Sequence, residues 1–285
     1  MGEVKQNYKD SVFTKMFGRE DKKYLLQLYR ALHPDDNKTD TDDLKLVTIE
    51  NVLTNDIYND LGFIANGRLV VLVEAQSTWS PNIIARMFIY LARTYQDYIY
   101  SDDKIKARLY SDCKIDLPIP EMYVIYTGNR AGKSDVLSLK DEFFKGNSLD
   151  IDLKAKVIFA DDGRKDIIGQ YIAFCIVVKQ QLDIHNDKKV AVQEAIRICI
   201  ENGDLVDYLT SHRKEVEDVM FALLTQEEAT KSYGALQRME AEAEDLKALV
   251  NILKNYCKDF DSLFAAVKKD EHFSHLSEED VRKYY

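Results

Sequence analysis

The pattern of apolar and polar positions is clearest between residues 57 and 77. Two apolar arms, residues 57–65 and 68–77, flank the pair Asn66-Gly67. Apolar arms around an Asn-Gly pair are typical of a β-hairpin, because both residues adopt a positive φ at low cost. We therefore predict two antiparallel strands joined by a turn at these two residues.

Helical periodicity dominates on both sides of this hairpin. Residues 12–33 carry apolar side chains at steps of three and four, with Gly18 as a weak point, and Pro34 ends the region. Residues 82–100 show the same spacing and predict a second helix. The later segments predict two strands and a helix, at residues 118–128, 153–162 and 166–182.

The last third of the chain shows only helical patterns. We expect an α/β domain with a mixed sheet flanked by helices at residues 1–185, followed by an all-helical region at residues 186–285. Residues 44–53 fit either a strand or a helix. A doubly wound nucleotide-binding fold is not expected, because no glycine-rich turn joins the first strand to a helix.

Composition and charge narrow the class of protein. The chain has 285 residues, is 46% apolar and carries a net charge of −10, which argues against broad binding to nucleic acid. The acidity is uneven: residues 186–285 hold 21 acids and 14 bases, whereas residues 1–185 hold 28 acids and 25 bases. The near-balanced charge of residues 1–185 therefore allows a local basic groove there.

Targeting signals and cysteine spacing indicate a cytoplasmic protein. The N-terminal sequence has no apolar core of a signal peptide. The longest apolar run, Ile167–Val178, is too short to cross a membrane, so no membrane partner is expected. The four cysteines form no Cys-x-x-Cys pair, which argues against a zinc or redox motif and fits a reducing compartment.

Two carboxylates in the hairpin have no obvious structural purpose. Asp60 opens the first arm, and Glu74 follows the β-prone run of the second arm, two residues before Gln76. Two carboxylates close together in a partly buried site repel each other, and Mg²⁺, which prefers oxygen ligands, removes that conflict. Exposed acids at strand ends are the alternative interpretation.

Whether Asp60 meets Glu74 depends on the hairpin register. A two-residue loop pairs Ile64 with Leu69 and places the two carboxylates on opposite faces. A three-residue loop pairs Ile64 with Arg68 and brings both carboxylates to one face. A shared metal or acid–base site requires the second register, or a β-bulge with the same effect.

Several segments carry a family resemblance. They are "NDLGF", "VLVEAQSTWSPNIIARMFIYLARTYQDYI", "KDSVFTKMFG" and "IPEMYVIYTG". Over residues 8–185 the chain resembles the PD-(D/E)XK (restriction-endonuclease-like) superfamily, and within it the bacterial Rpn family of recombination-promoting nucleases, whose members are also described as transposases. The resemblance implies a metal-dependent DNA endonuclease that hydrolyses phosphodiester bonds in recombination, mobile-element biology or defence. DNA would be its partner, and a homodimer would supply one site for each strand.

The resemblance also implies roles for individual residues. Asp60, Glu74 and the backbone carbonyl of Ala75 would bind Mg²⁺, with Mn²⁺ or Ca²⁺ as alternatives. The position of Gln76 would lie beside the attacking water. Two further residues, on the helix at 82–100, would contact DNA phosphate: Arg86 and Tyr90.

The position of Gln76 departs from the superfamily pattern, in which a lysine is usual. Glutamine orients a water molecule but carries no charge and cannot act as a general base. The alternative function is therefore a weakly active or inactive nuclease-fold protein that serves as a DNA-binding or regulatory module. A solvated helix face is the alternative interpretation of Arg86 and Tyr90.

Other motifs are weaker. The loop "GNRAGKS", Gly128–Ser134, follows a predicted strand but has one residue too few for a P-loop, so we expect a surface turn and no nucleotide cofactor. The pair His272-x-x-His275 lacks a third metal ligand nearby. The amphipathic segment at residues 238–256 is expected to be a packing helix, with a homodimer contact as the alternative.

Overall fold

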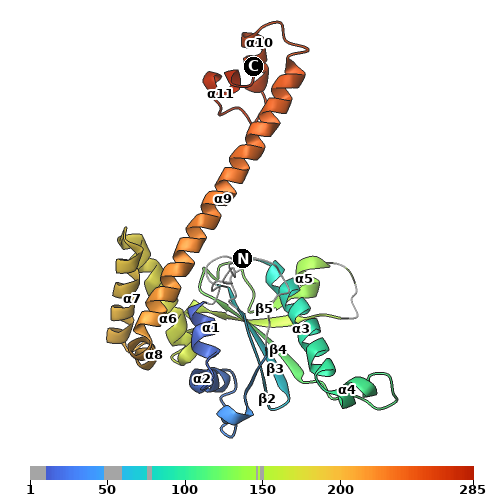
Figure 1. The fold of residues 1–285 in the computed structure, drawn as a ribbon, viewed down its shortest axis with the longest axis vertical. Helices are drawn as coiled ribbons and strands as arrows, with labels where there is room; N and C mark the ends of the chain where they lie inside the picture. Colours follow the sequence, from blue (N-terminus) through green and yellow to red (C-terminus); the bar gives the residue numbers. More distant parts are fainter. Residues whose placement is uncertain (1–10, 48–59, 76–78, 146, 148–150) are drawn as a thin grey trace, which may run out of the picture. The chain divides into compact units, whose positions relative to one another are not determined.

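The structure, a computed structural model, is an α/β fold with a mixed six-stranded sheet (Figure 1). It describes residues 11–47, 60–75, 79–145, 147 and 151–285, with residues 73–75 and 226–240 as backbone only. The strands stand in the order β1-β2-β3-β4-β6-β5. Their bounds are Lys45–Val47 (β1), Asp60–Ala65 (β2), Arg68–Ala75 (β3), Ile119–Tyr126 (β4), Val136–Ser138 (β5) and Lys154–Phe159 (β6).

The predicted hairpin and the two later predicted strands are present as β2–β3, β4 and β6. Part of the ambiguous segment, residues 45–47, is the edge strand β1, and residues 48–53 lie outside the described residues. β3, β4 and β6 run parallel, whereas β1–β2, β2–β3 and β5–β6 are antiparallel. Ala75, Tyr126 and Phe159 stand side by side, so the carboxyl ends of the parallel strands share one edge of the sheet.

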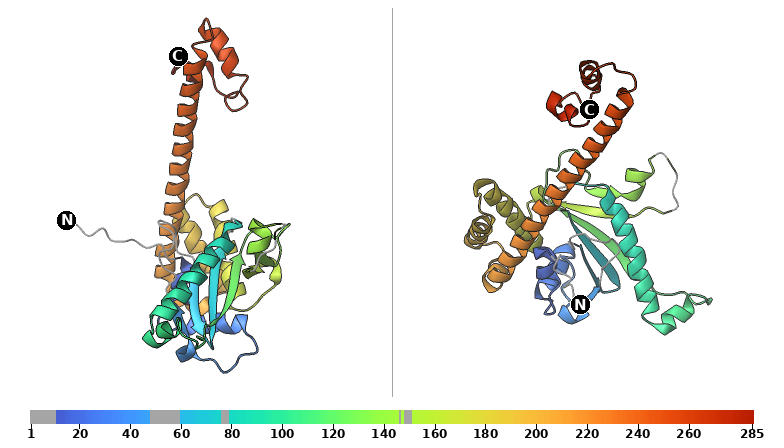
Figure 2. Two further views of the ribbon diagram at one scale, coloured as in Figure 1. Left: turned by 90° about the vertical axis from the view of Figure 1, so that its right-hand side faces the viewer. Right: turned by 45° about the horizontal axis from the view of Figure 1, so that its top comes forward.

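Helices cover both faces of the sheet (Figure 2). α3 (Asn82–Tyr100) packs on one face, and α1 (Val12–Phe17), α2 (Lys23–Leu32) and α6 (Ile167–Ile184) pack on the other. The adjacent residues Val70 and Val71 are therefore both fully buried. This two-sided burial explains why β3 reads as a continuous apolar run instead of an alternating one.

The single helical region predicted at residues 12–33 is two helices in the structure. α1 ends at Gly18, whose backbone N–H donates to the carbonyl oxygen of Thr14 at 2.8 Å. The chain restarts at Lys22, which has a positive φ of 53°, and α2 follows. The weak point expected at Gly18 is thus a complete break in the helix.

α6 is longer than the apolar run recognised in the sequence. It extends to Ile184 and, over 18 residues, is long and apolar enough to cross a membrane by length and composition. Core helices of soluble proteins pass the same test. In this fold the ring of Tyr171 on α6 packs edge-on against Phe13 and Phe17 of α1, as a core helix does.

The expected C-terminal helical region is present, and its helices follow one another from residue 188. They are α7 (Lys188–Asn202), α8 (Val206–Ser211), α9 (Arg213–Leu253), α10 (Phe260–Val267) and α11 (Glu278–Arg282). The two compact units of the chain are Met1–Leu223 and Leu224–Tyr285, whereas the sequence suggested a division after residue 185. α7 and α8 belong to the first unit. The second unit has a small core of its own, in which Leu246, Leu263 and Val267 are buried.

The remaining helical segments are short. α4 (Asp103–Arg108) begins at Asp102, whose carboxylate accepts hydrogen bonds from the backbone N–H groups of Lys104 and Ile105. α5 (Leu139–Phe143) begins in the same way at Ser138, whose hydroxyl accepts from the N–H of Asp141. Both starts follow the expected preference for a side-chain oxygen at the N-cap.

Candidate active site

Asp60 lies at the open end of the hairpin, by which we mean the end opposite the Asn66-Gly67 turn. Its side chain is only 10% exposed. Arg86 Nη2 lies 3.5 Å from Asp60 Oδ1, and the hydroxyl of Tyr90 donates a hydrogen bond to the carboxylate. The structure therefore brings together three of the residues nominated from the sequence.

Helix α3 delivers both partners of Asp60. Arg86 and Tyr90 are four residues apart, so they lie on one side of the helix. Ile84 and Met87 are fully buried against the sheet, and Tyr90 packs partly buried against the same core. These apolar contacts set the rotation of α3 about its axis, and that rotation directs Arg86 toward the start of β2.

The surroundings of Asp60 disfavour its ionised form. Burial raises the pKa of the carboxyl, while the charge of Arg86 and the hydrogen bond from Tyr90 lower it by less, so the pKa stays above its ordinary value. The contact with Arg86 lacks hydrogen-bond geometry, and Asp60 Oδ1 and Arg86 Nε are buried without hydrogen-bond partners. Buried polar atoms without partners are rare in native proteins and mark candidate functional sites.

The hairpin register differs from the one that a shared site required. Ile64 pairs with Leu69 and Asp60 pairs with Val73, which is the register of the two-residue loop. The three-residue loop is therefore wrong. Both turn residues have a positive φ, 48° at Asn66 and 71° at Gly67. A turn of this kind matches the twist of the strands, so no extra loop residue is needed.

The end of β3 is only partly described. Backbone pairing continues through Glu74, which stands beside Ile125, to Ala75, which stands beside Tyr126. The side chains of Glu74 and Ala75, and all of Gln76, lie outside the described residues. The two-residue register, with regular pairing through Ala75, does not supply the arrangement that a shared Asp60–Glu74 site required.

The described residues supply one candidate metal ligand at this end of the sheet. Asp60 Oδ1 is a buried oxygen without a hydrogen-bond partner, which suits a hard cation. Arg86, 3.5 Å away, compensates the same charge. Within the described part of the chain no group of three His, Cys, Asp or Glu side chains is arranged to hold a metal ion. Asp60 fits Mg²⁺ as one ligand of a set that the strand end must complete.

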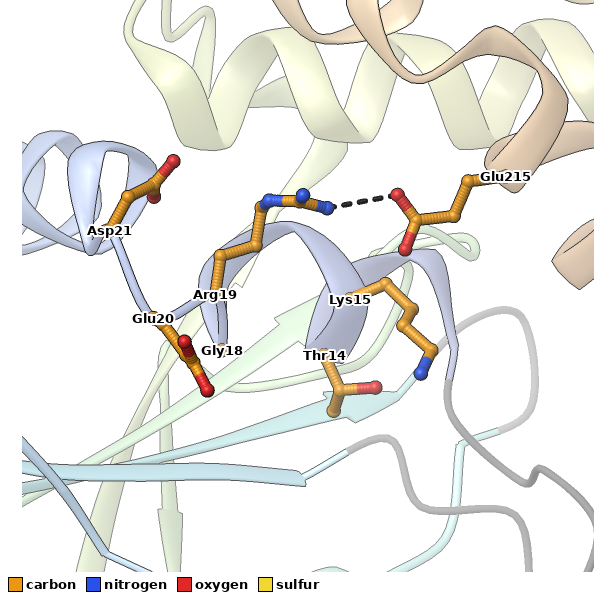
Figure 3. Close-up of a pocket in the computed structure, with 7 residues that line it drawn as sticks. All are labelled: Thr14, Lys15, Gly18, Arg19, Glu20, Asp21 and Glu215. Atoms are coloured by element: carbon orange, nitrogen blue, oxygen red, sulfur yellow. Dashed lines mark hydrogen bonds and ion pairs between the residues drawn. The ribbon is translucent and has the colours of Figure 1, made fainter.

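A separate cavity of about 660 Å³ opens beside α1 (Figure 3). Arg19 and Glu215 point toward each other across it and form an ion pair of 2.8 Å. Lys15, Glu20 and Asp21 also line the cavity. This mixture of two bases and three acids favours neither an anion nor a cation, and the Arg19–Glu215 pair ties the loop after α1 to the first turn of α9.

A second cavity, of about 600 Å³, lies beside the turn of the hairpin and includes Tyr29, His33, Asp36 and Arg68. His33 Nε2 lies 2.7 Å from Glu121 Oε2, and the guanidinium of Arg68 donates to the same carboxylate. Every one of these polar groups has a partner, so the cluster serves to hold the turn. Its members are far apart in the sequence, so no local motif predicts the cluster.

Sequence reasoning also passed over one cation–aromatic contact near the carboxyl edge of the sheet. Lys133, from the loop "GNRAGKS", lies over the rings of Trp79 and Tyr126. The loop is indeed a turn, as expected. Its position over two aromatic rings had no signal in the sequence, because cation–aromatic contacts between distant segments leave no periodic pattern.

Comparison of the chain with family models, curated proteins and solved structures found no match.

Proposed function

We propose that this protein is a metal-dependent DNA endonuclease with a PD-(D/E)XK-type core. The observation that carries the proposal is the buried carboxylate of Asp60, with an unpartnered oxygen, held between Arg86 and Tyr90 at the open end of the hairpin. A fold gains nothing from burying this group, since burial raises its pKa and leaves polar atoms unsatisfied. Function is the physical reason to retain it.

The proposed division of labour follows from the chemistry of each side chain. Asp60, Glu74 and the carbonyl of Ala75 hold Mg²⁺, which, when bound, lowers the pKa of a coordinated water and offsets charge on the phosphate. Arg86 binds the scissile phosphate through its planar guanidinium, and Tyr90 keeps Asp60 oriented. The side-chain amide of Gln76 orients the attacking water.

Two conditions go with this assignment. Arg86 must turn from Asp60 to the phosphate when DNA arrives, which its 36% exposed side chain permits. Glu74 must also reach the face of Asp60, although Asp60 pairs with Val73 and β3 keeps regular backbone pairing through Ala75. A homodimer with one site for each strand is part of the same proposal, together with a role in recombination, mobile-element biology or defence.

A non-catalytic nuclease-fold module is the second candidate, and a specific observation favours it. The two-residue register pairs Asp60 with Val73, and Arg86 already compensates the Asp60 charge. A carboxylate neutralised in this way has less affinity for a cation. Gln76, which replaces the usual lysine, points in the same direction. Such a protein would bind DNA or a regulator without cutting.

Cleavage of supercoiled plasmid with Mg²⁺, with Mn²⁺ and with EDTA tests the proposal. We expect nicking by the native chain with metal, and a loss of about 1000-fold in Asp60→Ala and Glu74→Ala, because metal assistance contributes several kcal/mol to the transition state. Asp97→Ala is the matched control, since Asp97 is an exposed acid of α3. Equal nicking by all four proteins would overturn the enzyme, and metal-independent binding without nicking would support the second candidate.

A further inference from the structure

The carboxyl edge of the parallel strands carries an aromatic group that the proposed mechanism does not use. Tyr126 and Phe159, the last residues of β4 and β6, stand side by side with their rings edge to face at 6.1 Å. Trp79, which precedes α3, packs edge-on against Tyr126 at 5.2 Å. Ligands of open parallel sheets bind outside this edge of the strands. We call Trp79, Tyr126 and Phe159 the edge aromatics.

The loop at residues 128–134 is held firmly over the edge aromatics. Its Arg130 contacts Asp135, Asp161 and Asp162 at 2.6, 3.2 and 3.1 Å, and its guanidinium lies 4.3 Å from the ring centre of Phe159. Three carboxylates thus neutralise this one cation. Arg130 is an anchor for the loop, and its charge is not available to a ligand.

Lys133 has a different environment in the same loop. Its Nζ lies 5.3 Å from the ring centre of Tyr126 and 5.9 Å from that of Trp79. It donates one hydrogen bond, to the carbonyl oxygen of Asn129 at 2.7 Å. Among the described side chains no carboxylate forms an ion pair with it. An ammonium group has three donors, so Lys133 keeps hydrogen-bonding capacity and its full charge at the edge of the sheet.

We infer that Lys133 binds a phosphate of the DNA backbone and so guides the strand across the carboxyl edge of the sheet; the inference rests on the proposed function for the identity of the ligand. The two aromatic rings hold the ammonium group in place before DNA arrives, which reduces the entropy lost on binding. We expect the loop to make only one phosphate contact, because three carboxylates already neutralise Arg130. They belong to Asp135, Asp161 and Asp162.

The hydrogen bonds inside the loop argue against a nucleotide polyphosphate as its ligand. A phosphate-binding loop presents its backbone N–H groups to the ligand. Here the N–H of Ala131 donates to Asn129 Oδ1 at 2.8 Å, and the N–H of Lys133 donates to the carbonyl oxygen of Arg130 at 2.8 Å. Both N–H groups are engaged inside the loop. What the loop offers a ligand is the Lys133 side chain, which recognises charge and not base identity.

The test is DNA binding by the full chain in EDTA, measured by the anisotropy of a labelled duplex at several salt concentrations. Lys133→Ala should bind roughly fivefold to tenfold more weakly at low salt and lower the slope of log K against log salt by about 0.9, as expected for the loss of one phosphate contact. Lys133→Arg should restore both values. Lys156→Ala is the matched control, because Lys156 also lies over a tyrosine, 5.6 Å from the ring centre of Tyr123.

The fluorescence of the chain supplies a direct second readout, since Trp79 is the only tryptophan. A DNA phosphate bound to Lys133 beside the Trp79 ring should change the emission of the native chain and of Lys156→Ala. The inference is overturned if Lys133→Ala keeps native affinity and salt slope, or if the native chain does not bind DNA. A chain that binds DNA through Lys133 but never cleaves it leaves the inference standing and refutes the endonuclease, because binding is measured without metal.

Discussion

The two ends of the β2–β3 hairpin are built on opposite principles. At the turn, Asp36 accepts hydrogen bonds from Tyr29 at 2.7 Å, Thr39 at 2.8 Å and Asn66 at 2.8 Å. At the open end, the atoms Asp60 Oδ1 and Arg86 Nε are buried without hydrogen-bond partners. The hairpin therefore has a hydrogen-bonded carboxylate packed beside its turn, and at its open end a carboxylate with one oxygen that lacks a hydrogen-bond partner.

The pKa shifts of the two carboxylates have opposite signs. Hydrogen bonds from Tyr29 and Thr39 lower the pKa of Asp36, so its ionised form stabilises the fold. Burial raises the pKa of Asp60, so its ionised form opposes folding. The difference teaches that the turn is arranged for stability, whereas the arrangement at the open end lowers stability.

The largest expected effect comes from Asp60→Asn, which tests both halves of the comparison. Cleavage should fall about 1000-fold if Asp60 binds the metal. Stability should instead rise at neutral pH. The raised pKa of native Asp60 means that its contribution is favourable below the unfolded pKa, about 3.9, and is lost as the pH rises through the folded value.

Thermal unfolding between pH 3.5 and 8 checks this sign. The stability gain of Asp60→Asn should shrink as the pH falls through the raised pKa of native Asp60. Asp97→Asn, an exposed change on the same helix, is the control. If Asp60→Asn is less stable than the native chain at pH 7, burial of the ionised Asp60 does not destabilise the fold.

Glu121→Gln should give the next largest effect, because the carboxylate of Glu121 binds His33 and Arg68 near the turn of the hairpin. Burial raises the pKa of Glu121, but hydrogen bonds and charges from His33 and Arg68 lower it by more, so it lies below its ordinary value. Its stabilising contribution is present above the unfolded pKa and is lost as the pH falls through the folded one. We expect a loss of about 2 kcal/mol at pH 7, typical of hydrogen bonds to a charged group.

Urea unfolding at pH 7 and at pH 3.5 measures this loss. The difference between Glu121→Gln and the native chain should narrow at the lower pH. Glu142→Gln, at an exposed position on α5, should leave stability unchanged at both values. A difference that stays constant with pH argues against an ionised Glu121.

Gly67→Ala tests the turn that sets the register. Gly67 has a φ of 71°, and an added Cβ would meet nothing within 4 Å, so the cost is that of the backbone conformation alone. We expect a loss of about 1.5 kcal/mol in urea unfolding, because a side chain disfavours the left-handed region. Gly67→Asn should lose less, since asparagine tolerates that region. Equal losses in both variants would argue for a different turn.

Tyr29→Phe should give the smallest effect, because it removes a single hydroxyl from the hydrogen-bond network beside the hairpin turn. The ring stays stacked on His33 at 4.4 Å, while the hydrogen bond to Asp36 disappears. A loss of about 1 kcal/mol in urea unfolding is expected. Tyr100→Phe, at a half-exposed position, is the control. No loss in Tyr29→Phe would mean that the network at the turn adds nothing to stability.

The sequence predicted the local elements of the site well. Asn-Gly chemistry located the hairpin, and the apolar stripe of residues 82–100 located α3 with the same bounds that the structure has. Arg86 and Tyr90 share one side of that helix because they are four residues apart. Each of these predictions depends on neighbours in the chain, and for that reason the sequence alone was enough.

Other features depended on packing between distant segments. The sequence left two registers open, and the hairpin adopted the one that pairs Asp60 with Val73. The division of the chain at Leu223 and Leu224, inside the long helix α9, also differs from the boundary suggested by the change of pattern near residue 186. Helical periodicity alone does not reveal which core a helix joins.

What the sequence determined by itself were the hairpin turn, the amphipathic helix and the residues that lie on one side of it, because these follow from interactions a few residues apart. Tertiary structure decided that Asp60 is buried against Arg86 and that Lys133 lies over Trp79. Both contacts join segments far apart in the chain. They form only when apolar faces pack in one particular order, and no local pattern encodes that order.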